Sequence, residues 1–209
     1  MNSVVQNYDV QPLFAIPYFR TNFKNLISAE QVAFIKNLKM VQNQQNLISE
    51  NLYIFEEPEL KGIKDAVQEA LNIYAKEVMG IEQQLYVTQS WSLVNQPGIG
   101  MHTHSHSNSI VSGSLYFAEL PSPVSRMVFD KHISYRRLEI NPSKERQNVF
   151  NTPINVVVPK THDLLLFPSE LNHMVEPNMS NQPRYSIAFN CFIRGKLGHY
   201  RDVSELILE

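Results

Sequence analysis

From residue 85 to residue 193 the sequence is a succession of short β-type runs. Val, Ile, Leu, Phe and Tyr fill the runs, and Pro, Gly, Asn or Ser stands between one run and the next, which is typical of strands joined by turns. The runs are LYVTQSWSLV (85–94), SIVSGSLYF (109–117), SRMVFD (125–130), INVVVP (154–159), DLLLFP (163–168) and RYSIAFNCFI (184–193). Such a series predicts a mostly antiparallel sandwich or barrel.

Two helices are predicted ahead of these strands. Ser28 and, three residues later, Gln31 have the pattern of a capping box, so a helix is expected over residues 28–42. In residues 58–79 apolar side chains recur at three- and four-residue steps, and Gly80 is placed to end this second helix. Helices followed by strands predict the α+β class, with both helices packed on the β-structure.

The remaining segments complete the expected organisation. The aromatic run 12–23 is interrupted by a proline and is expected to form an edge strand. The least regular segment, 131–153, is interpreted as a solvated loop. No internal repeat separates the chain into units, so one domain over residues 1–209 is predicted, with a helical buttress at about 25–80 and a β-core at about 84–195.

Composition excludes several classes of protein. The chain has 209 residues, 43% hydrophobic and 18% charged, which suits a globular domain with a sizeable core. A formal charge of -2 and a pI of about 6.4 give no basic field, so no nucleic-acid partner is expected. No signal peptide or apolar span of about 18 residues is visible. The single cysteine, Cys191, can form no internal disulfide, so a cytoplasmic protein without membrane contact is expected.

Three of the seven histidines stand at alternate positions, His102, His104 and His106, just ahead of a predicted strand. Alternate residues of a strand face the same side about 6.6 Å apart, so two adjacent imidazoles can bind one metal ion. The outer two lie roughly 13 Å apart on an extended strand, too far to share an ion. One adjacent pair with a histidine from elsewhere is therefore the simplest site, and the alternative is a polar strand end where histidines face water.

A third ligand and a buried cation follow in the C-terminal runs. His173 comes after an apolar strand and a turn and opens another strand, and Arg184 follows eleven residues later. On alternating strand geometry Arg184 and Ser186 share a face of an interior strand. A buried arginine needs an anion, and its planar fork suits a carboxylate. The alternative is a salt bridge to Glu170 or Glu176.

These residues resemble a family, the 2-oxoglutarate/iron(II) dioxygenases, and within it a prolyl-hydroxylase-like branch of oxygenases. The resemblance runs from about residue 53 to residue 193 and implies a double-stranded β-helix, or jelly roll. Its motifs are WSLVNQPG (91–98), HSHSNSIVSGSLY (104–116), FDKH (129–132), FPSELNHMV (167–175) and RYSIAFN (184–190). The chain departs from the family pattern at Ser107, Lys131, His132, His162 and Glu170, which concerns pocket shape and substrate rather than any ligand.

The resemblance also selects a metal site. Spacing from Gly98 favours His104 and His106, rather than His102 and His104, as the pair that binds the metal with His173. Three imidazoles carry no charge, so the affinity for Fe(II) should fall and Zn(II) or Cu(II) should compete. Asp130 is the alternative source of a carboxylate.

For the cosubstrate, the resemblance implies 2-oxoglutarate. Its far carboxylate needs a cation and a hydroxyl, the roles expected of Arg184 and Ser186. Tyr116 stands where family members often carry a tyrosine that binds the same carboxylate, although it can equally be a core aromatic residue.

The function implied is an Fe(II)-, 2-oxoglutarate- and O2-dependent oxygenase. It would hydroxylate a C–H bond of a small molecule or peptide, with an amino-acid or peptidyl side chain, prolyl among them, as the expected substrate. Two alternatives stay open: a non-catalytic jelly-roll binding protein with a structural metal, and a three-histidine metalloenzyme, such as a hydrolytic zinc enzyme, that does not use 2-oxoglutarate. A homodimer is also left open.

Overall fold

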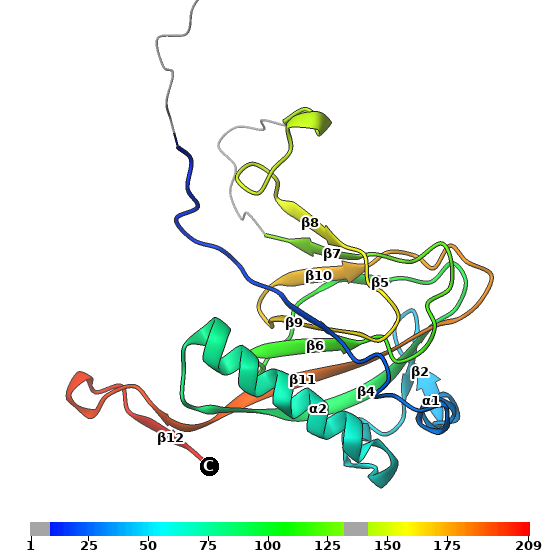
Figure 1. Cartoon of the computed structure of the whole chain (residues 1–209), viewed down its shortest axis with the longest axis horizontal. Coiled ribbons are helices and arrows are strands. Elements are labelled where there is room, and N and C mark those ends of the chain that lie inside the picture. Colours follow the sequence, from blue (N-terminus) through cyan, green and yellow to red (C-terminus); the bar gives the residue numbers. More distant parts are fainter. Residues whose placement is uncertain (1–8, 132–141) are drawn as a thin grey trace, which may run out of the picture.

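Two facing antiparallel sheets form the centre of the molecule. The computed structural model describes residues 9–131 and 142–209 of the chain. Within this part, two α-helices cover the outer face of the larger sheet, and the smaller sheet lies on its other side (Figure 1). The expected α+β jelly roll is confirmed.

The larger sheet has eight strands among the described residues. Every pairing in it is antiparallel, and β1 lies at one edge, as expected for the N-terminal run. In spatial order the strands are β1 (Phe19–Asn22), β9 (Asp163–Pro168), β6 (Val111–Leu115), β11 (Arg184–Leu197), β4 (Gln84–Asn95), β3 (Leu47–Ser49) and β2 (Met40–Gln42), with β12 (Leu206–Leu208) paired to the end of β11.

The smaller sheet carries the strands around the histidines. It has four strands among the described residues, and β5 lies at its edge, paired only with β10. In spatial order they are β5 (Met101–His104), β10 (Asn172–Val175), β7 (Met127–Asp130) and β8 (Ile154–Val157).

The first helix, α1 (Ala29–Lys36), begins as predicted and ends early. Ser28 Oγ accepts the Gln31 N–H, and the Gln31 side chain accepts the Ser28 N–H, which completes the capping box. The expected helix over 28–42 was too long, because residues 40–42 form β2 and pair with β3. Strand pairing here overrides the local helical periodicity.

The second helical segment has the predicted extent but three kinds of turn. A 3-10 turn (Pro58–Leu60) leads into α2 (Lys61–Ile73), which continues as a π-helical segment (Tyr74–Met79). Gly80 ends it with a φ of 65°, the left-handed conformation expected of a C-terminal glycine. Further 3-10 turns lie at Ile54–Glu56, Lys144–Arg146 and Tyr200–Asp202.

Two hydrophobic cores hold these layers together. The larger core lies between the helices and the outer face of the larger sheet, where α2 buries one apolar stripe: Ile63, Val67, Ala70 and Leu71. The smaller core lies between the two sheets and consists of Tyr116, Met127, Phe129, Val157, Leu165 and Phe167. Burial on both faces explains the continuous apolar run of β9.

Cys191 belongs to the larger core. It is fully buried on β11, and burial raises the pKa of its thiol far above the ordinary value. The interpretation of this cysteine as a small hydrophobic residue is therefore confirmed.

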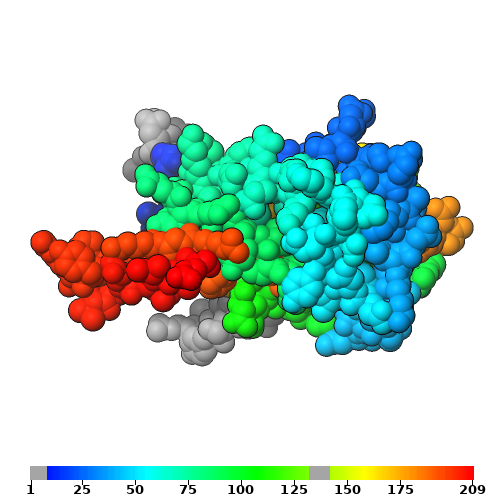
Figure 2. All heavy atoms as spheres, turned by 90° about the horizontal axis from the view of Figure 1, so that it is seen from below, coloured from blue at the N-terminus to red at the C-terminus, as the bar shows by residue number. Residues whose placement is uncertain are grey.

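The chain ends in a hairpin that projects from the body, formed by the end of β11 and β12 (Figure 2). No helix in the described ranges is long and apolar enough to cross a membrane. Of the irregular segment 131–153, residues 132–141 lie outside the described part, and 143–151 are exposed.

Candidate active site

His104 and His173 meet across two neighbouring strands. They are directly paired residues of β5 and β10, so their side chains leave the sheet on the same face. Their ring centroids lie 4.4 Å apart. The register of this pairing therefore creates a two-histidine site without any loop.

His106 joins this pair from beyond the strand. The strand spacing used to compare the three histidines does not extend to His106, because β5 ends at His104. After the strand the chain bends, and the His106 N–H donates to the Ser169 carbonyl oxygen over 2.9 Å. The Nε2 atoms of His106 and His173 then lie 3.3 Å apart. One ligand nitrogen from each of His104, His106 and His173 lies within 4.8 Å of the others.

Main-chain carbonyls orient two of the three imidazoles. The Nδ1–H of His104 donates to the His102 carbonyl over 2.8 Å, and the Nδ1–H of His173 donates to the Leu171 carbonyl over 2.9 Å. These bonds fix the tautomer in which Nε2 carries the free lone pair, the usual arrangement at metal-binding histidines.

Burial keeps the three imidazoles neutral. Desolvation lowers the pKa of His173 to about 3 and that of His106 to about 4, with smaller contributions from the neighbouring histidines. It also lowers the pKa of His104. The neutral imidazole is the form that binds a metal ion, so the group is ready to do so at neutral pH.

The alternative ligands lie outside this group. His102 is exposed, and its ring centroid is 5.3 Å from that of His104. Asp130 is paired with Asn172, one position away from the His173–Phe129 pair, so its side chain leaves the sheet on the opposite face. Neither residue belongs to the three-histidine group.

Two of the remaining histidines are also separate from the group. His162 has a φ of 69° in the turn before β9, and the exposed His199 accepts the Arg201 N–H. His132 lies outside the described residues.

Arg184 is a buried cation on the interior strand β11. Only 2% of it is exposed, and neither acidic residue that could have paired with it does so, since Glu176 is paired with Arg126 and Glu170 is exposed. Its guanidinium lies over the Tyr116 ring at 5.1 Å, and Nη1 is 3.5 Å from Ser186 Oγ, the long limit of a hydrogen bond. Arg184 and Ser186 share a face of the strand, as predicted.

Unpartnered polar atoms gather at this arginine. Three buried side-chain polar atoms of the described residues have no hydrogen-bond partner: Asn46 Nδ2, Tyr116 OH and Arg184 Nε. Two of the three belong to the stacked pair Tyr116 and Arg184. Buried polar groups are rarely left unsatisfied, so this pair indicates a site for a ligand that accepts hydrogen bonds.

The arginine and the histidines face the same space between the sheets. Ala188, on the same face of β11 as Arg184, is paired with Trp91, whose ring centroid lies 6.3 Å from that of His106. Tyr116 belongs to the inter-sheet core together with Phe167, and the Phe167 ring centroid lies 4.7 Å from that of His173. One interior therefore holds both groups.

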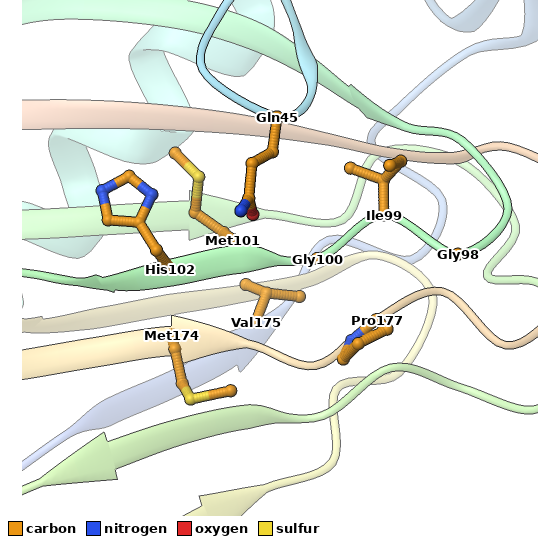
Figure 3. Close-up of a pocket in the computed structure, with 9 residues that line it drawn as sticks. All are labelled: Gln45, Gly98, Ile99, Gly100, Met101, His102, Met174, Val175 and Pro177. Atoms are coloured by element: carbon orange, nitrogen blue, oxygen red, sulfur yellow. The ribbon is translucent and has the colours of Figure 1, made fainter.

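A groove of about 430 Å³ opens along β5 and β10, with His102 in its lining (Figure 3). Its lining is mostly apolar, and Gln45, from the loop between β2 and β3, and His102 add polar groups. His102 lies two residues before His104, so the groove adjoins the three-histidine group. The residues that line it are Gln45, Gly98, Ile99, Gly100, Met101, His102, Met174, Val175 and Pro177.

Two asparagines that the sequence did not single out hold the loop ahead of β5. Asn178 accepts the Gly98 N–H and donates its own N–H to the Ile99 carbonyl, at 2.7 and 3.0 Å. Asn95 Nδ2 donates to the Gly100 carbonyl at 2.9 Å. A Cβ at Gly100 would lie 2.6 Å from the Val175 carbonyl oxygen, so this close approach requires glycine.

Comparisons with known proteins agree with this geometry. Residues 89–190 match the family model described as "Putative 2OG-Fe(II) oxygenase". This range contains the three histidines and Arg184. No curated protein matches the chain in sequence.

Solved structures share the fold. A 2OG-Fe(II) oxygenase-family oxidoreductase from Burkholderia pseudomallei is 11% identical, with a TM-score of 0.56 over 78% of this chain and 76% of that one. HygX from Streptomyces hygroscopicus, solved with nickel, 2-oxoglutarate and hygromycin B, is 13% identical, with a TM-score of 0.58 over 84% and 82%. A Pseudomonas putida prolyl-4-hydroxylase is 15% identical, with a TM-score of 0.55 over 86% and 94%.

Proposed function

We propose that this chain, whose residues 89–190 match the 2OG-Fe(II) oxygenase family model, is a member of that family and an Fe(II)- and 2-oxoglutarate-dependent hydroxylase. The observation that carries the proposal is the buried Arg184, which has no acidic partner in the described structure and lies over Tyr116 beside the interior that holds three histidines. A structural metal site alone gives no reason for such a cation.

The metal ion would be held by His104, His106 and His173. Three neutral imidazoles suit Fe(II), and they also suit Zn(II) and Cu(II), because no carboxylate adds the charge that favours a hard ion. We therefore expect the purified protein to take up Zn(II) or Cu(II) in competition with Fe(II), and to need Fe(II) loading before assay.

The cosubstrate would be held by Arg184, Ser186 and Tyr116. The guanidinium provides a charged donor, and the unpartnered Tyr116 hydroxyl and Arg184 Nε provide two hydrogen-bond donors in one place. A carboxylate has the acceptor oxygens to satisfy both. A protein with a structural or hydrolytic metal would leave these donors without a use.

When bound, Fe(II) and 2-oxoglutarate would supply an oxidation in which one oxygen atom of O2 goes to the succinate formed from 2-oxoglutarate with loss of CO2, and the other is inserted into a substrate C–H bond. The chain's own residues would bind the metal ion and 2-oxoglutarate, orient the substrate and exclude water. Phe129 and Phe167 cover His173 with ring centroids at 6.2 and 4.7 Å, so one side of the group is shielded from solvent.

The substrate would enter from the groove along β5 and β10. Ile99, Met101 and Val175 suit an apolar side chain, and Gln45 and His102 can bind the amide groups that flank it (Figure 3). We therefore propose an amino-acid or peptidyl side chain as the substrate, with the prolyl ring as the first to test. The prolyl-4-hydroxylase among the structural neighbours supports this choice by fold alone.

Succinate release tests the proposal without a known substrate. Protein loaded with Fe(II) and supplied with 2-oxoglutarate, O2 and ascorbate should produce succinate slowly, and a proline-containing peptide that is a substrate should raise this rate. His173→Ala, which removes one of the three imidazoles, is the matched control and should release none above background. Equal succinate from the wild type and His173→Ala would exclude the proposed function.

A further inference from the structure

One tight turn, Pro168–Leu171, contacts two of the three histidines. The Leu171 N–H donates to the Pro168 carbonyl over 3.1 Å and closes the turn. From within it, the Leu171 carbonyl orients the His173 imidazole and the Ser169 carbonyl accepts the His106 N–H. The turn therefore orients the His173 ring and holds the main chain of His106.

His106 depends on this turn more than the other two histidines do. His104 and His173 are fixed by strand pairing, whereas His106 lies in the loop between β5 and β6. The main chain of Ser169 clamps this loop at two points, since it accepts from the His106 N–H and donates to the Ile110 carbonyl, at 2.9 and 3.0 Å.

A cluster of three hydroxyls, which we term the serine cluster (Ser109, Ser112 and Ser169), fixes the turn itself. Ser169 Oγ is at its centre, 2.7 Å from Ser109 Oγ and 2.8 Å from Ser112 Oγ. Ser109 lies in the loop that carries His106 and also bonds the main chain of Cys191, whereas Ser112 lies on β6. One hydroxyl thus joins the turn, the loop and the larger sheet.

We infer that Ser169 is a positioning residue for the metal site, and that its hydroxyl holds His106 where it can bind an ion together with His104 and His173. The inference rests on the proposed function, because it assumes that these imidazoles bind a metal. Ser169 does not touch the ion's ligand atoms itself, and it acts through its main chain and through the serine cluster.

The physical reason is that two of the three hydroxyls of the serine cluster, those of Ser112 and Ser169, are buried, whereas Ser109 is half-buried. Ser112 and Ser169 are each 1% exposed, so a hydroxyl that loses its partner here cannot turn to solvent. With Ser169→Ala, the hydroxyls of Ser109 and Ser112 would lose the partner they share, and the loop would keep only main-chain bonds to the turn. His106 would then sample positions away from the other two histidines.

Co(II) binding tests this inference by calorimetry and by visible absorption, which depends on the number and kind of ligands. Ser169→Ala should weaken Co(II) binding roughly 10–100-fold, as other residues that hold metal-binding groups in place do. Its bound Co(II) spectrum should resemble that of His106→Ala rather than that of the wild type. Adding His106→Ala to Ser169→Ala should weaken Co(II) binding little further. Adding His104→Ala to Ser169→Ala should weaken Co(II) binding by as much as His104→Ala does on its own.

Ser114→Ala is the matched control, since Ser114 is a buried serine two residues along β6 that makes no hydrogen bond to the serine cluster. It should keep the wild-type affinity and spectrum. If Ser169→Ala does not fold, Ser109→Ala is measured in its place, with the same expected spectrum. A folded variant that binds Co(II) as the wild type does, or binds it weakly with an unchanged spectrum, overturns the inference. Failure of the wild type to bind Co(II) would instead overturn the proposed function.

Discussion

Arg184 shows how a single side chain carries functional information. A guanidinium is among the side chains least often buried, and here it lies in an interior strand with an aromatic face and a hydroxyl as neighbours. The face of Tyr116 attracts the positive charge but satisfies none of its N–H donors. The Nε–H of Arg184 therefore requires a hydrogen-bond acceptor that the described residues do not provide.

Replacing this cation should abolish tight binding of the cosubstrate. Arg184→Ala should weaken 2-oxoglutarate binding by about 2–5 kcal/mol, because a buried charge pair loses one partner. Anaerobic calorimetry with Mn(II) in place of Fe(II) measures this without turnover. Arg194→Ala is the control, since Arg194 lies on the same strand and over an aromatic ring, that of Tyr86 at 4.1 Å, but is exposed. Equal affinities of Arg184→Ala and the wild type would place the carboxylate elsewhere.

At the scale of elements, the end of β5 decides which histidines meet. Because the strand stops at His104, the chain bends and brings His106 back toward His173, while His102 stays on the exposed part of the strand. An extended strand through all three positions would have kept the outer two apart.

The metal content of reconstituted variants should show whether His106 or His102 binds the ion. His106→Ala should lose the ion, because one of three imidazoles is removed, whereas His102→Ala should retain it. His104→Ala and His173→Ala should lose it under either pairing and serve as positive controls. Atomic absorption of the desalted proteins gives the answer. Should His102→Ala come out empty while His106→Ala keeps its metal, the pairing proposed here is wrong.

Elements with a strong, uninterrupted pattern could be predicted from the sequence. The bounds of β9 match the predicted run, and Gly80 ends the second helical segment as expected, because the apolar run and the left-handed glycine are local signals. The hairpin of β2 and β3 could not be predicted, since its stability comes from pairing with β4 rather than from its own residues. The bend after His104 was missed for the same reason: it depends on a hydrogen bond to Ser169, 63 positions away in the chain.

The chemical residues of the candidate site could be predicted from the sequence, whereas the residues that hold its loops in place could not. The three histidines and Arg184 carry chemistry that stands out in a sequence of strands. Ser169 and Asn178, which hold loops through main-chain bonds, are polar residues in turns and look like any others. Only the fold shows that both are buried, at 1% exposure each.

For the whole molecule, the candidate site lies between two sheets that share only a small core. His104 and His173 belong to the smaller sheet, whereas Arg184 and Tyr116 extend from the larger one. A metal ion and a dicarboxylate bound together would connect the two sheets. We therefore expect ligand binding to stabilise the entire fold rather than one loop.

Thermal unfolding should show this coupling. A ligand present at about 100 times its Kd stabilises a protein by about 2.7 kcal/mol, which for a chain of this size corresponds to a rise of roughly 5–10 °C in Tm. Mn(II) should raise the Tm, and 2-oxoglutarate should raise it further only when Mn(II) is present. EDTA should reverse both shifts, and His173→Ala should show neither. A shift by 2-oxoglutarate in the presence of EDTA would mean that the two ligands bind independently.

The buried Cys191 gives the experimenter a chain without a reactive thiol. The only sulfhydryl group in the sequence is inside the larger core, its ionisation suppressed by burial, and thiolates rather than thiols react with maleimides and iodoacetamide. Reducing agents can be left out of iron assays without risk of disulfide-linked dimers of the folded protein. A cysteine introduced at the exposed Gln45 on the rim of the groove would be the sole attachment point for a fluorophore or spin label, which would then report directly on what enters.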